Sequence, residues 1–195
     1  MKYLKQLKSC QTQKDLAILL GYSEKNFTRI LFSENITTRD QDLAITIKIG
    51  RKSRIFETTR EVKILQTRLS ILLSNCYREL ELKRLSTSSY VNCISSHGFR
   101  KKLKINIPTS KQNRTSLEAK EINFGIYSNA QKHTGKRLVL NIDLKDFFES
   151  ITFSRIVGFF SKNKLFSLPF DIAILIAQIV TYRESTSKEG FLPQG

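Results

Sequence analysis

The sequence predicts a mixed α/β protein of the α+β kind, and three patterns of apolar residues support this prediction. Apolar residues recur at helical spacing in residues 12–32, 59–85 and 154–182. Residues 43–57 instead combine apolar alternation with a turn at 50–53, as a basic β-hairpin does. Residues 137–143 form a short apolar run that is typical of a buried strand. We therefore expect helices combined with a small amount of sheet.

The N-terminal segment, residues 1–42, is expected to be helical. Thr12 or Gln13 is placed to cap one helix, which Gly21 ends, and Ser23 is placed to cap the next. Two short helices joined by a glycine turn occur in helix-turn-helix DNA readers. Helical hairpins also serve simply as packing units, so both interpretations remain open for this segment.

The middle of the chain is predicted to be one long helix followed by irregular structure. The helix over 59–85 has an apolar stripe formed by Val62, Leu65, Leu69, Leu72, Leu73 and Tyr77. Residues 86–132 are expected to form loops, with an irregular basic insertion near 103–123 and a short helix near 116–122. After the strand at 137–143, Ser154 is expected to cap a helix and Pro169 to begin another.

Charge is the most informative feature of the composition. Lys and Arg number 33 against 17 Asp and Glu, which gives a net charge of +16. Such a field favours polyanions, of which nucleic acid is the commonest. Charge alone leaves open a non-binding basic surface or an anionic membrane. No apolar run is long enough for a transmembrane helix. The three cysteines are widely spaced and odd in number, which favours the reducing cytoplasm.

The residues that suggest chemistry follow the predicted strand at 137–143. Asp143 ends this strand and begins the sequence Asp-Leu-Lys-Asp-Phe-Phe. A carboxylate at a buried strand end is costly unless it is paired or binds a cation, and Mg²⁺ takes oxygen ligands and bridges to phosphates. A helix cap or a solvated aspartate explains the same residue equally well. The hexapeptide alone therefore leaves both interpretations open.

Several motifs, taken in order, resemble those of bacterial retron-type reverse transcriptases. The segment 138–151, Leu-Val-Leu-Asn-Ile-Asp-Leu-Lys-Asp-Phe-Phe-Glu-Ser-Ile, is similar to the first palm motif of that family, and Phe-Leu-Pro-Gln-Gly at 191–195 is similar to the start of the next. Gly-Arg-Lys-Ser-Arg-Ile at 50–55 resembles its basic fingers hairpin, and the segments 97–101 and 128–133 resemble the region before the palm. Each match is weak alone, and their common order carries the resemblance.

The resemblance implies a fold and a role for each matching residue. It implies a right-hand polymerase with fingers at 43–135 and the beginning of the palm at 136–195, where helices cover one face of the first palm strand. Asp143 and the main-chain carbonyl of Leu144 would hold Mg²⁺, of which the complete enzyme uses two ions. Phe148 would exclude a 2′-hydroxyl by its bulk, and Arg54 and Gln194 would contact the incoming nucleotide. The residues implied to contact nucleic acid are Arg51, Lys52, Arg100, Lys101 and Lys102.

This chain departs from the family pattern in three places. Thr58 and Thr59 stand where the family has a proline-containing turn, and the segment 103–123 is an addition. The sequence contains no Tyr-x-Asp-Asp, which supplies the remaining metal-binding carboxylates in the family. Because one aspartate cannot neutralise two divalent ions, we expect this chain to be an incomplete fragment that is inactive alone.

The resemblance also implies partners, and other functions remain open. A retron-type enzyme of the bacterial cytoplasm copies a structured non-coding RNA into DNA, forms an RNA–DNA hybrid from dNTPs and acts in defence against phage, in some cases with an effector protein. Close alternatives are a defence-associated or group II intron reverse transcriptase and a catalytically dead RNA-binding remnant. A DNA-binding regulator built on residues 12–32 is a third class of function, and this class gives the motif that begins at Asp143 no role.

Overall fold

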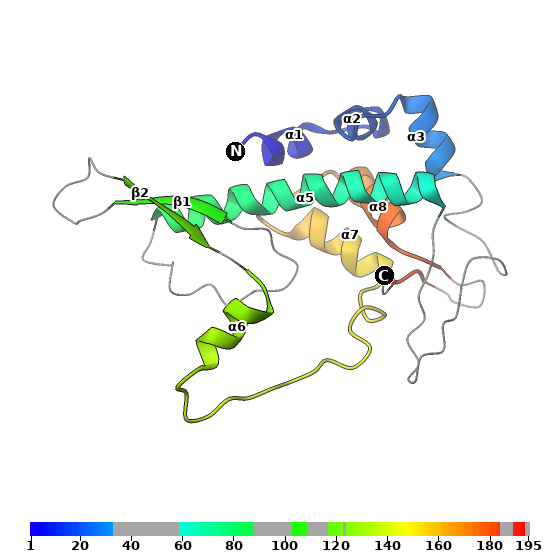
Figure 1. Ribbon diagram of the computed structural model, residues 1–195. Coiled ribbons are helices and arrows are strands. Elements are labelled where there is room, and N and C mark those ends of the chain that lie inside the picture. The colour runs from blue at the N-terminus through cyan, green and yellow to red at the C-terminus, as the bar shows by residue number, and fades with distance from the viewer. Residues whose placement is uncertain (33–58, 88–102, 109–116, 123, 184–188, 194–195) are drawn as a thin grey trace. The chain divides into compact units, whose positions relative to one another are not determined.

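The structure is a computed structural model that describes residues 1–32, 59–87, 103–108, 117–122, 124–183 and 189–193 (Figure 1). The chain forms two compact units. The first unit contains residues 1–76 and 144–195, and the second contains residues 77–143. In the part of the chain that is described, no helix has the length and apolar character needed to cross a membrane. The basic hairpin predicted over 43–57 lies outside the described residues.

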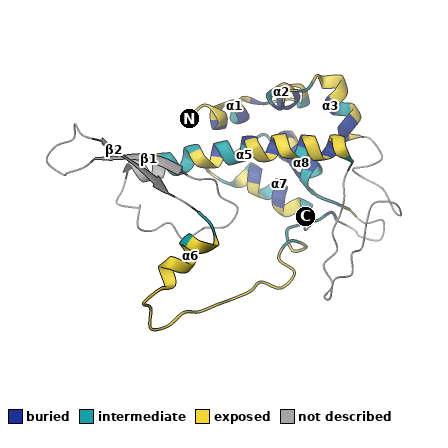
Figure 2. Cartoon of the chain, in the orientation of Figure 1, coloured by how far each residue is buried: buried dark blue, intermediate teal, exposed yellow. Residues whose placement is uncertain are grey.

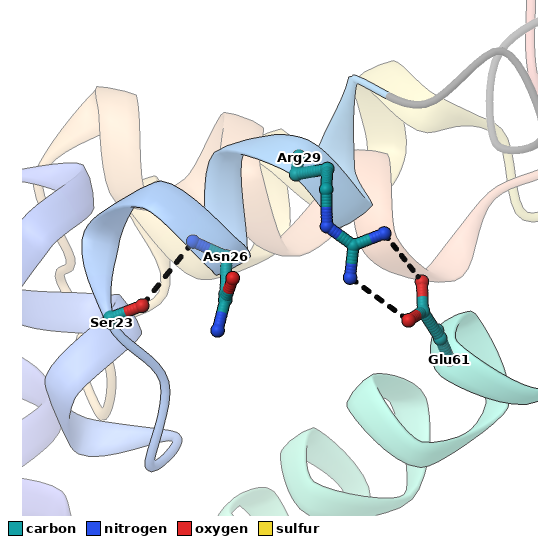
Figure 3. Close-up of polar contacts among 4 residues, drawn as sticks. All are labelled: Ser23, Asn26, Arg29 and Glu61. Carbon is teal, nitrogen blue, oxygen red and sulfur yellow. Dashed lines mark hydrogen bonds and ion pairs between the residues drawn. The ribbon is translucent and has the colours of Figure 1, made fainter.

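Three short helices begin the first unit. They are α1 (Tyr3–Ser9), α2 (Gln13–Leu19) and α3 (Glu24–Leu31). The predicted caps are confirmed for α2 and α3. The Thr12 hydroxyl accepts a hydrogen bond from the Asp15 amide, and the Asp15 carboxylate accepts one from the Thr12 amide, which completes a capping box. Ser23 accepts a hydrogen bond from the Asn26 amide at 3.4 Å (Figure 3). Gly21 ends α2 in the left-handed region, at φ 77°.

The N-terminal helices bury the residues that the sequence predicts. Leu16 and Ala17 of α2 and Phe27 of α3 are completely buried, and Ile30 and Leu31 are nearly so. The buried stripe of α3 and the pairing of its Arg29 with another helix favour the interpretation of α2 and α3 as a packing unit.

The long helix α5 (Arg60–Thr87) confirms the helix predicted over 59–85. Its first part, up to Cys76, belongs to the first unit and lies alongside α1–α3, α7 and α8 (Figure 1). Most of the predicted stripe is buried, namely Val62, Leu65, Leu69 and Leu72. The prediction was wrong for Tyr77, which is 44% exposed, while the neighbouring Cys76 is completely buried. The stripe drifts along the helix because 3.6 residues per turn do not divide evenly into a seven-residue spacing.

Polar contacts join α5 to the helices around it. Arg29 of α3 donates two hydrogen bonds to the Glu61 carboxylate, at 3.0 and 2.9 Å (Figure 3). These bonds hold the pKa of Glu61 below its ordinary value. Arg68 donates to the carbonyls of Leu20 and Gly21, at 2.9 and 2.8 Å, so it satisfies orphan acceptors at the end of α2. The face of α5 toward α2 is therefore fixed by backbone acceptors as well as by apolar packing.

The C-terminal helices of the first unit pack on each other. They are α7 (Phe153–Lys162) and α8 (Phe170–Val180), and α8 also contacts α2. Ile172, Ile176 and Ile179 of α8 are 0–1% exposed, as the helical spacing predicts. Gln66 of α5 donates to the carbonyl of Ile179 at 2.9 Å. In α7, Phe159 is 49% exposed, whereas Ile156, Val157 and Phe160 are buried.

The second unit differs most from the prediction. Strands β1 (Leu103–Pro108) and β2 (Leu117–Ile122) pair antiparallel, with Leu103 opposite Ile122 and Pro108 opposite Leu117. The short helix predicted near 116–122 was therefore wrong, because cross-strand pairing overrides the local helical pattern. Helix α6 (Ile126–His133) follows where loops were predicted, and it buries no residue (Figure 2).

The apolar segment after α6 is exposed. Leu138, Leu140 and Ile142 are 88%, 81% and 70% exposed, and residues 137–143 have no regular structure. A strand forms only where a neighbouring strand accepts its hydrogen bonds, and among the described residues none pairs with this segment. The structure thus differs from the predicted buried strand over 137–143.

Candidate functional site

The segment after Asp143 folds into a compact turn. The Ser150 amide donates to the carbonyl of Asp146 at 2.9 Å, and the Ser150 hydroxyl donates to the carbonyl of Phe147 at 2.7 Å. Asp146 has φ 50°, in the left-handed region that aspartate tolerates better than most residues. The Arg155 guanidinium donates to the carbonyl of Ser150 at 2.8 Å. A helix residue therefore holds the turn that carries Phe147 and Phe148.

A small set of backbone pairs joins this turn to the C-terminal segment. Phe191 lies between Thr152 and Tyr182 and makes an antiparallel bridge with each. The Phe153 amide donates to the carbonyl of Gly190 at 2.8 Å, and the Leu192 amide donates to the carbonyl of Ile151 at 2.9 Å. These contacts bring residues 150–153 and 190–192, far apart in the sequence, side by side. The end of the first motif that resembles the palm is thus a neighbour of the second motif within the first unit.

Gly190 permits this close approach. A Cβ atom at residue 190 would lie 3.1 Å from the carbonyl oxygen of Tyr182 and 3.3 Å from the hydroxyl of Thr181. These distances are shorter than ordinary van der Waals contact, so a larger residue would push the two segments apart. The Tyr182 and Phe191 rings meet nearby in an edge-to-face contact, with centroids 6.1 Å apart.

Glu189 anchors the same segment to the start of α7. Its carboxylate accepts hydrogen bonds from the amide of Ser154, at 2.7 Å, and from the Ser154 hydroxyl. The predicted role of Ser154 as a helix cap was wrong, because residue 152 occupies the cap position and Ser154 lies inside the first turn. The Glu189 carboxylate instead accepts a hydrogen bond from a first-turn amide that has no acceptor within the helix, and its negative charge lies at the positive end of the helix dipole. The Ser154 hydroxyl and amide, in this order, hold the pKa of Glu189 below its ordinary value.

We expect this contact to be lost in acid. A carboxyl group whose pKa is lowered in the folded state contributes stability above its ordinary pKa of 4.5, and this contribution disappears as the pH falls through the lower folded value. In NMR spectra, the Ser154 amide shift should therefore titrate with a midpoint below 4.5. The Glu189→Gln variant should abolish the titration, and Ser154→Ala should raise the Glu189 midpoint. A wild-type midpoint at or above 4.5 would contradict the contact.

The structure describes three of the residues that the sequence singles out. Asp143 is exposed, Leu144 is 63% exposed, and Phe148 is half-buried. Phe147 is 46% exposed and meets the Phe148 ring edge-on, with centroids 5.4 Å apart. Neither ring is buried core, because the two lie in a turn rather than an extended strand.

The remaining predicted site residues lie outside the described residues. They are Arg51, Lys52, Arg54, Arg100, Lys101, Lys102 and Gln194. Their roles stay predictions, although the position of Gln194 in the chain is two residues beyond Leu192, which is paired with Ile151.

The donor atoms near the turn suit a hard cation in part. Asp143 offers carboxylate oxygens and Leu144 offers a carbonyl oxygen, which are the ligands that Mg²⁺ prefers. Within the described ranges, no three His, Cys, Asp or Glu side chains come close enough together to hold a metal ion. Asp143 therefore offers one carboxylate to a cation, which is fewer than two divalent ions would need.

Sequence reasoning missed Arg155 and Glu189, which organise this region. Both act on main-chain groups, Arg155 on the carbonyl of Ser150 and Glu189 on the amide of Ser154. No spacing rule identifies them, because the Glu189 contact spans 35 residues of chain. The glycine that follows Glu189 was the available signal, since an isolated glycine often marks close backbone approach.

Comparison with known proteins connects part of the chain to reverse transcriptases. No family model matches the sequence. Over 86 residues the chain is 33% identical to a protein named Retron Mx65 reverse transcriptase, from Myxococcus xanthus. This match covers 44% of the chain and 19% of that protein, so the chain spans about a fifth of the length of its relative. The similarity supports a reverse-transcriptase-like function at the level of the family.

Proposed function

We propose that this chain is part of a retron-type reverse transcriptase, an RNA-directed DNA polymerase. Residues 1–42 form an N-terminal helical segment, 43–135 form the fingers, and 136–195 begin the palm. The observation that carries the proposal is the 33% identity to a retron reverse transcriptase over 86 residues. The pairing of Leu192 with Ile151 supports it, because a polymerase site needs its two palm motifs side by side.

In this proposal the residues around the turn bind the nucleotide and its metal ions. Asp143 and the carbonyl of Leu144 are ligands of Mg²⁺, and when bound, two such ions would activate a primer hydroxyl and stabilise the leaving pyrophosphate. Phe148 packs against the sugar and leaves no room for a 2′-hydroxyl, which favours deoxynucleotides. Arg54 binds the triphosphate through its planar guanidinium, and Gln194 lies beside the incoming nucleotide.

The proposed substrates are nucleic acids. A structured non-coding RNA serves as template and primer, and the product is an RNA–DNA hybrid made from dNTPs. The basic residues that track its phosphates are Arg51, Lys52, Arg100, Lys101 and Lys102. The net charge of +16 supports this substrate class. Defence against phage, with an effector protein as partner, is the proposed biological context.

We further propose that the 195 residues alone do not polymerise DNA. Asp143 supplies one carboxylate, and two divalent ions about 3.5–4 Å apart need several. The sequence has no Tyr-x-Asp-Asp that would supply the others. The net charge of +16 also fits a second candidate, an RNA-binding remnant that keeps the basic fingers and has lost catalysis.

Sequencing the gene beyond the codon of Gly195 separates the two candidates. We expect Ser-Pro and then Tyr-x-Asp-Asp in the same frame, and we expect the protein from that frame to synthesise DNA on an RNA template with Mg²⁺. Removing the metal with EDTA should abolish synthesis, and restoring Mg²⁺ should recover it. A stop codon after Gly195, with no neighbouring frame encoding the second half, would exclude the polymerase and leave the RNA-binding remnant.

A further inference from the structure

One peptide unit, between Ser150 and Ile151, links the turn that carries Phe148 to helix α7. Its N–H group, on Ile151, donates to the carbonyl of Phe148 at 3.0 Å. Its C=O group, on Ser150, accepts from the Arg155 guanidinium at 2.8 Å. A peptide unit is planar, and in the trans form its C=O and N–H groups point in opposite directions. A rotation of this one plane would therefore break both hydrogen bonds together.

The other bonds of the turn fix its shape but not its direction relative to α7. The carbonyl of Asp146 accepts from the Ser150 amide, and the carbonyl of Phe147 accepts from the Ser150 hydroxyl. Both bonds begin and end within residues 146–150. The bond from Arg155 instead comes from the first turn of α7, so it sets how the turn, with its half-buried Phe148 ring, is aimed from the helix.

A second group favours the placement of Arg155 at this carbonyl. The Glu189 carboxylate bonds the amide and the hydroxyl of Ser154, the residue before Arg155. The hydrogen bonds from Ser154, most of all, and the positive charge of Arg155, to a smaller extent, lower the pKa of Glu189. The Arg155 guanidinium is thus attracted by the Glu189 carboxylate while it donates to the carbonyl of Ser150.

We propose that Arg155 is a positioning residue that sets how strictly the site selects deoxynucleotides. This inference rests on the proposed function, in which Phe148 lies against the sugar and leaves no room for a 2′-hydroxyl. Exclusion by bulk depends on where the ring is held, because a displacement of about 1 Å can change a rate about 10²-fold. Arg155 acts through the Ser150–Ile151 peptide unit and contacts neither the sugar nor the metal in this role.

Hydrogen exchange of the 195-residue chain, followed by NMR, tests the link through the peptide unit. Arg155→Met keeps the length of the side chain but removes its donors. We expect the Ile151 amide to exchange about three- to tenfold faster in this variant, which is the effect of losing one hydrogen bond. The Leu192 amide, bonded to the carbonyl of the next peptide unit, should keep its rate.

Two further variants control this experiment. Lys162→Met removes an exposed cation from the last turn of the same helix, and it should leave the exchange of the Ile151 amide unchanged. Arg155→Lys keeps a charged donor on a long side chain, so it should restore most of the protection of that amide. Circular dichroism shows whether the three variants keep their helices.

Nucleotide selection by the protein from the complete reading frame tests the consequence. The measured quantity is the kcat/KM for dATP divided by that for ATP, on one RNA template. We expect Arg155→Met to lower this ratio about tenfold, mainly through a lower KM for ATP, because relief of a clash strengthens binding of the ribose. Arg155→Lys should recover most of the ratio, and Lys162→Met should keep the wild-type ratio. A general loss of stability would slow the use of both nucleotides alike and leave the ratio unchanged.

The outcomes separate this inference from the proposed function. If the wild-type protein makes DNA and Arg155→Met keeps the wild-type ratio, the positioning role is overturned and the proposed function stands. An equal loss of affinity for dATP and ATP would assign Arg155 to the triphosphate and would also overturn the role. Unchanged exchange of the Ile151 amide would exclude the peptide unit as the link. If the wild-type protein makes no DNA, the proposed function fails and the role in selection fails with it, while faster exchange would still show that Arg155 holds the turn.

Discussion

The Asp143→Asn variant is expected to lose metal-directed cleavage near residue 143 and, in the protein from the complete reading frame, about 10³-fold of its DNA synthesis. Iron(II) occupies the oxygen sites of Mg²⁺ and reduces added hydrogen peroxide to hydroxide and a hydroxyl radical, which cuts the nearby backbone. Ascorbate returns the resulting iron(III) to iron(II). Asparagine keeps the size of the side chain but removes its negative charge, which is the dominant attraction for a hard cation. Metal stabilisation of the transition state contributes several kcal/mol, which corresponds to roughly three powers of ten in rate.

The cleavage readout works on the 195-residue chain itself. We expect cuts around 143–146 with iron(II) and a dNTP, and we expect excess Mg²⁺ to suppress them. Asp171→Asn is the matched control, because Asp171 is an exposed aspartate in the first turn of α8. Cuts that persist unchanged in Asp143→Asn would remove Asp143 from the metal site, whatever the activity of the longer protein.

The second large effect is expected at the core of the first unit. Ile176 is completely buried in α8, so Ile176→Ala removes buried methyl groups and leaves a cavity. Such substitutions cost about 2–5 kcal/mol, a large share of the roughly 5–15 kcal/mol by which a domain is stable. The urea midpoint, followed by circular dichroism at 222 nm, should therefore fall sharply.

Ile64→Ala is the control for this substitution. Ile64 is an isoleucine in a helix as well, but it is 42% exposed, so its truncation leaves no enclosed cavity. We expect its urea midpoint to stay close to that of the wild type. Equal midpoints for Ile176→Ala and Ile64→Ala would mean that α8 is not part of the core that the structure shows.

The helices of the first unit could be predicted because their apolar residues repeat at the helical period. Leu16, Phe27, Leu65 and Ile176 all belong to such repeats, and all are completely buried. Helix α6 could not be found in this way, since it buries no residue and so has no apolar stripe. The burial prediction that failed depends on neighbouring elements, as Tyr77 shows: it belongs to the predicted apolar stripe but is 44% exposed.

The hairpin over 103–122 shows a different limit. Leu103, Ile105 and Ile107 alternate with polar residues, which is the strand period, but the alternation is short and is surrounded by Lys, Ser and Thr. The strand β1 forms because it pairs with β2 and shares backbone hydrogen bonds with it, and the local sequence pattern does not predict this pairing.

The candidate site was predictable only in its linear motifs. The resemblance identified residues 143–148 and 191–195 separately, and no local signal states that Phe191 lies between Thr152 and Tyr182. That arrangement depends on where α7 and α8 turn the chain, a property of tertiary packing. The roles of Arg155 and Glu189 also depend on tertiary packing. Arg155 bonds the carbonyl of Ser150 in the preceding turn, and Glu189 bonds the amide of Ser154, which is distant in the sequence.

Arg68 has a consequence for how this protein can change over evolution. Its guanidinium bonds the carbonyls of Leu20 and Gly21 and lies 4.5 Å from the centre of the Tyr22 ring. A Cβ atom at residue 21 would meet the guanidinium at 2.9 Å. Both hydrogen bonds come from the same nitrogen, Nη1. Lysine lacks a planar group that could lie over the ring while it donates to both carbonyls. Positions 21, 22 and 68 should therefore covary among homologous sequences, and losses at two of them should cost less than the sum of the single losses.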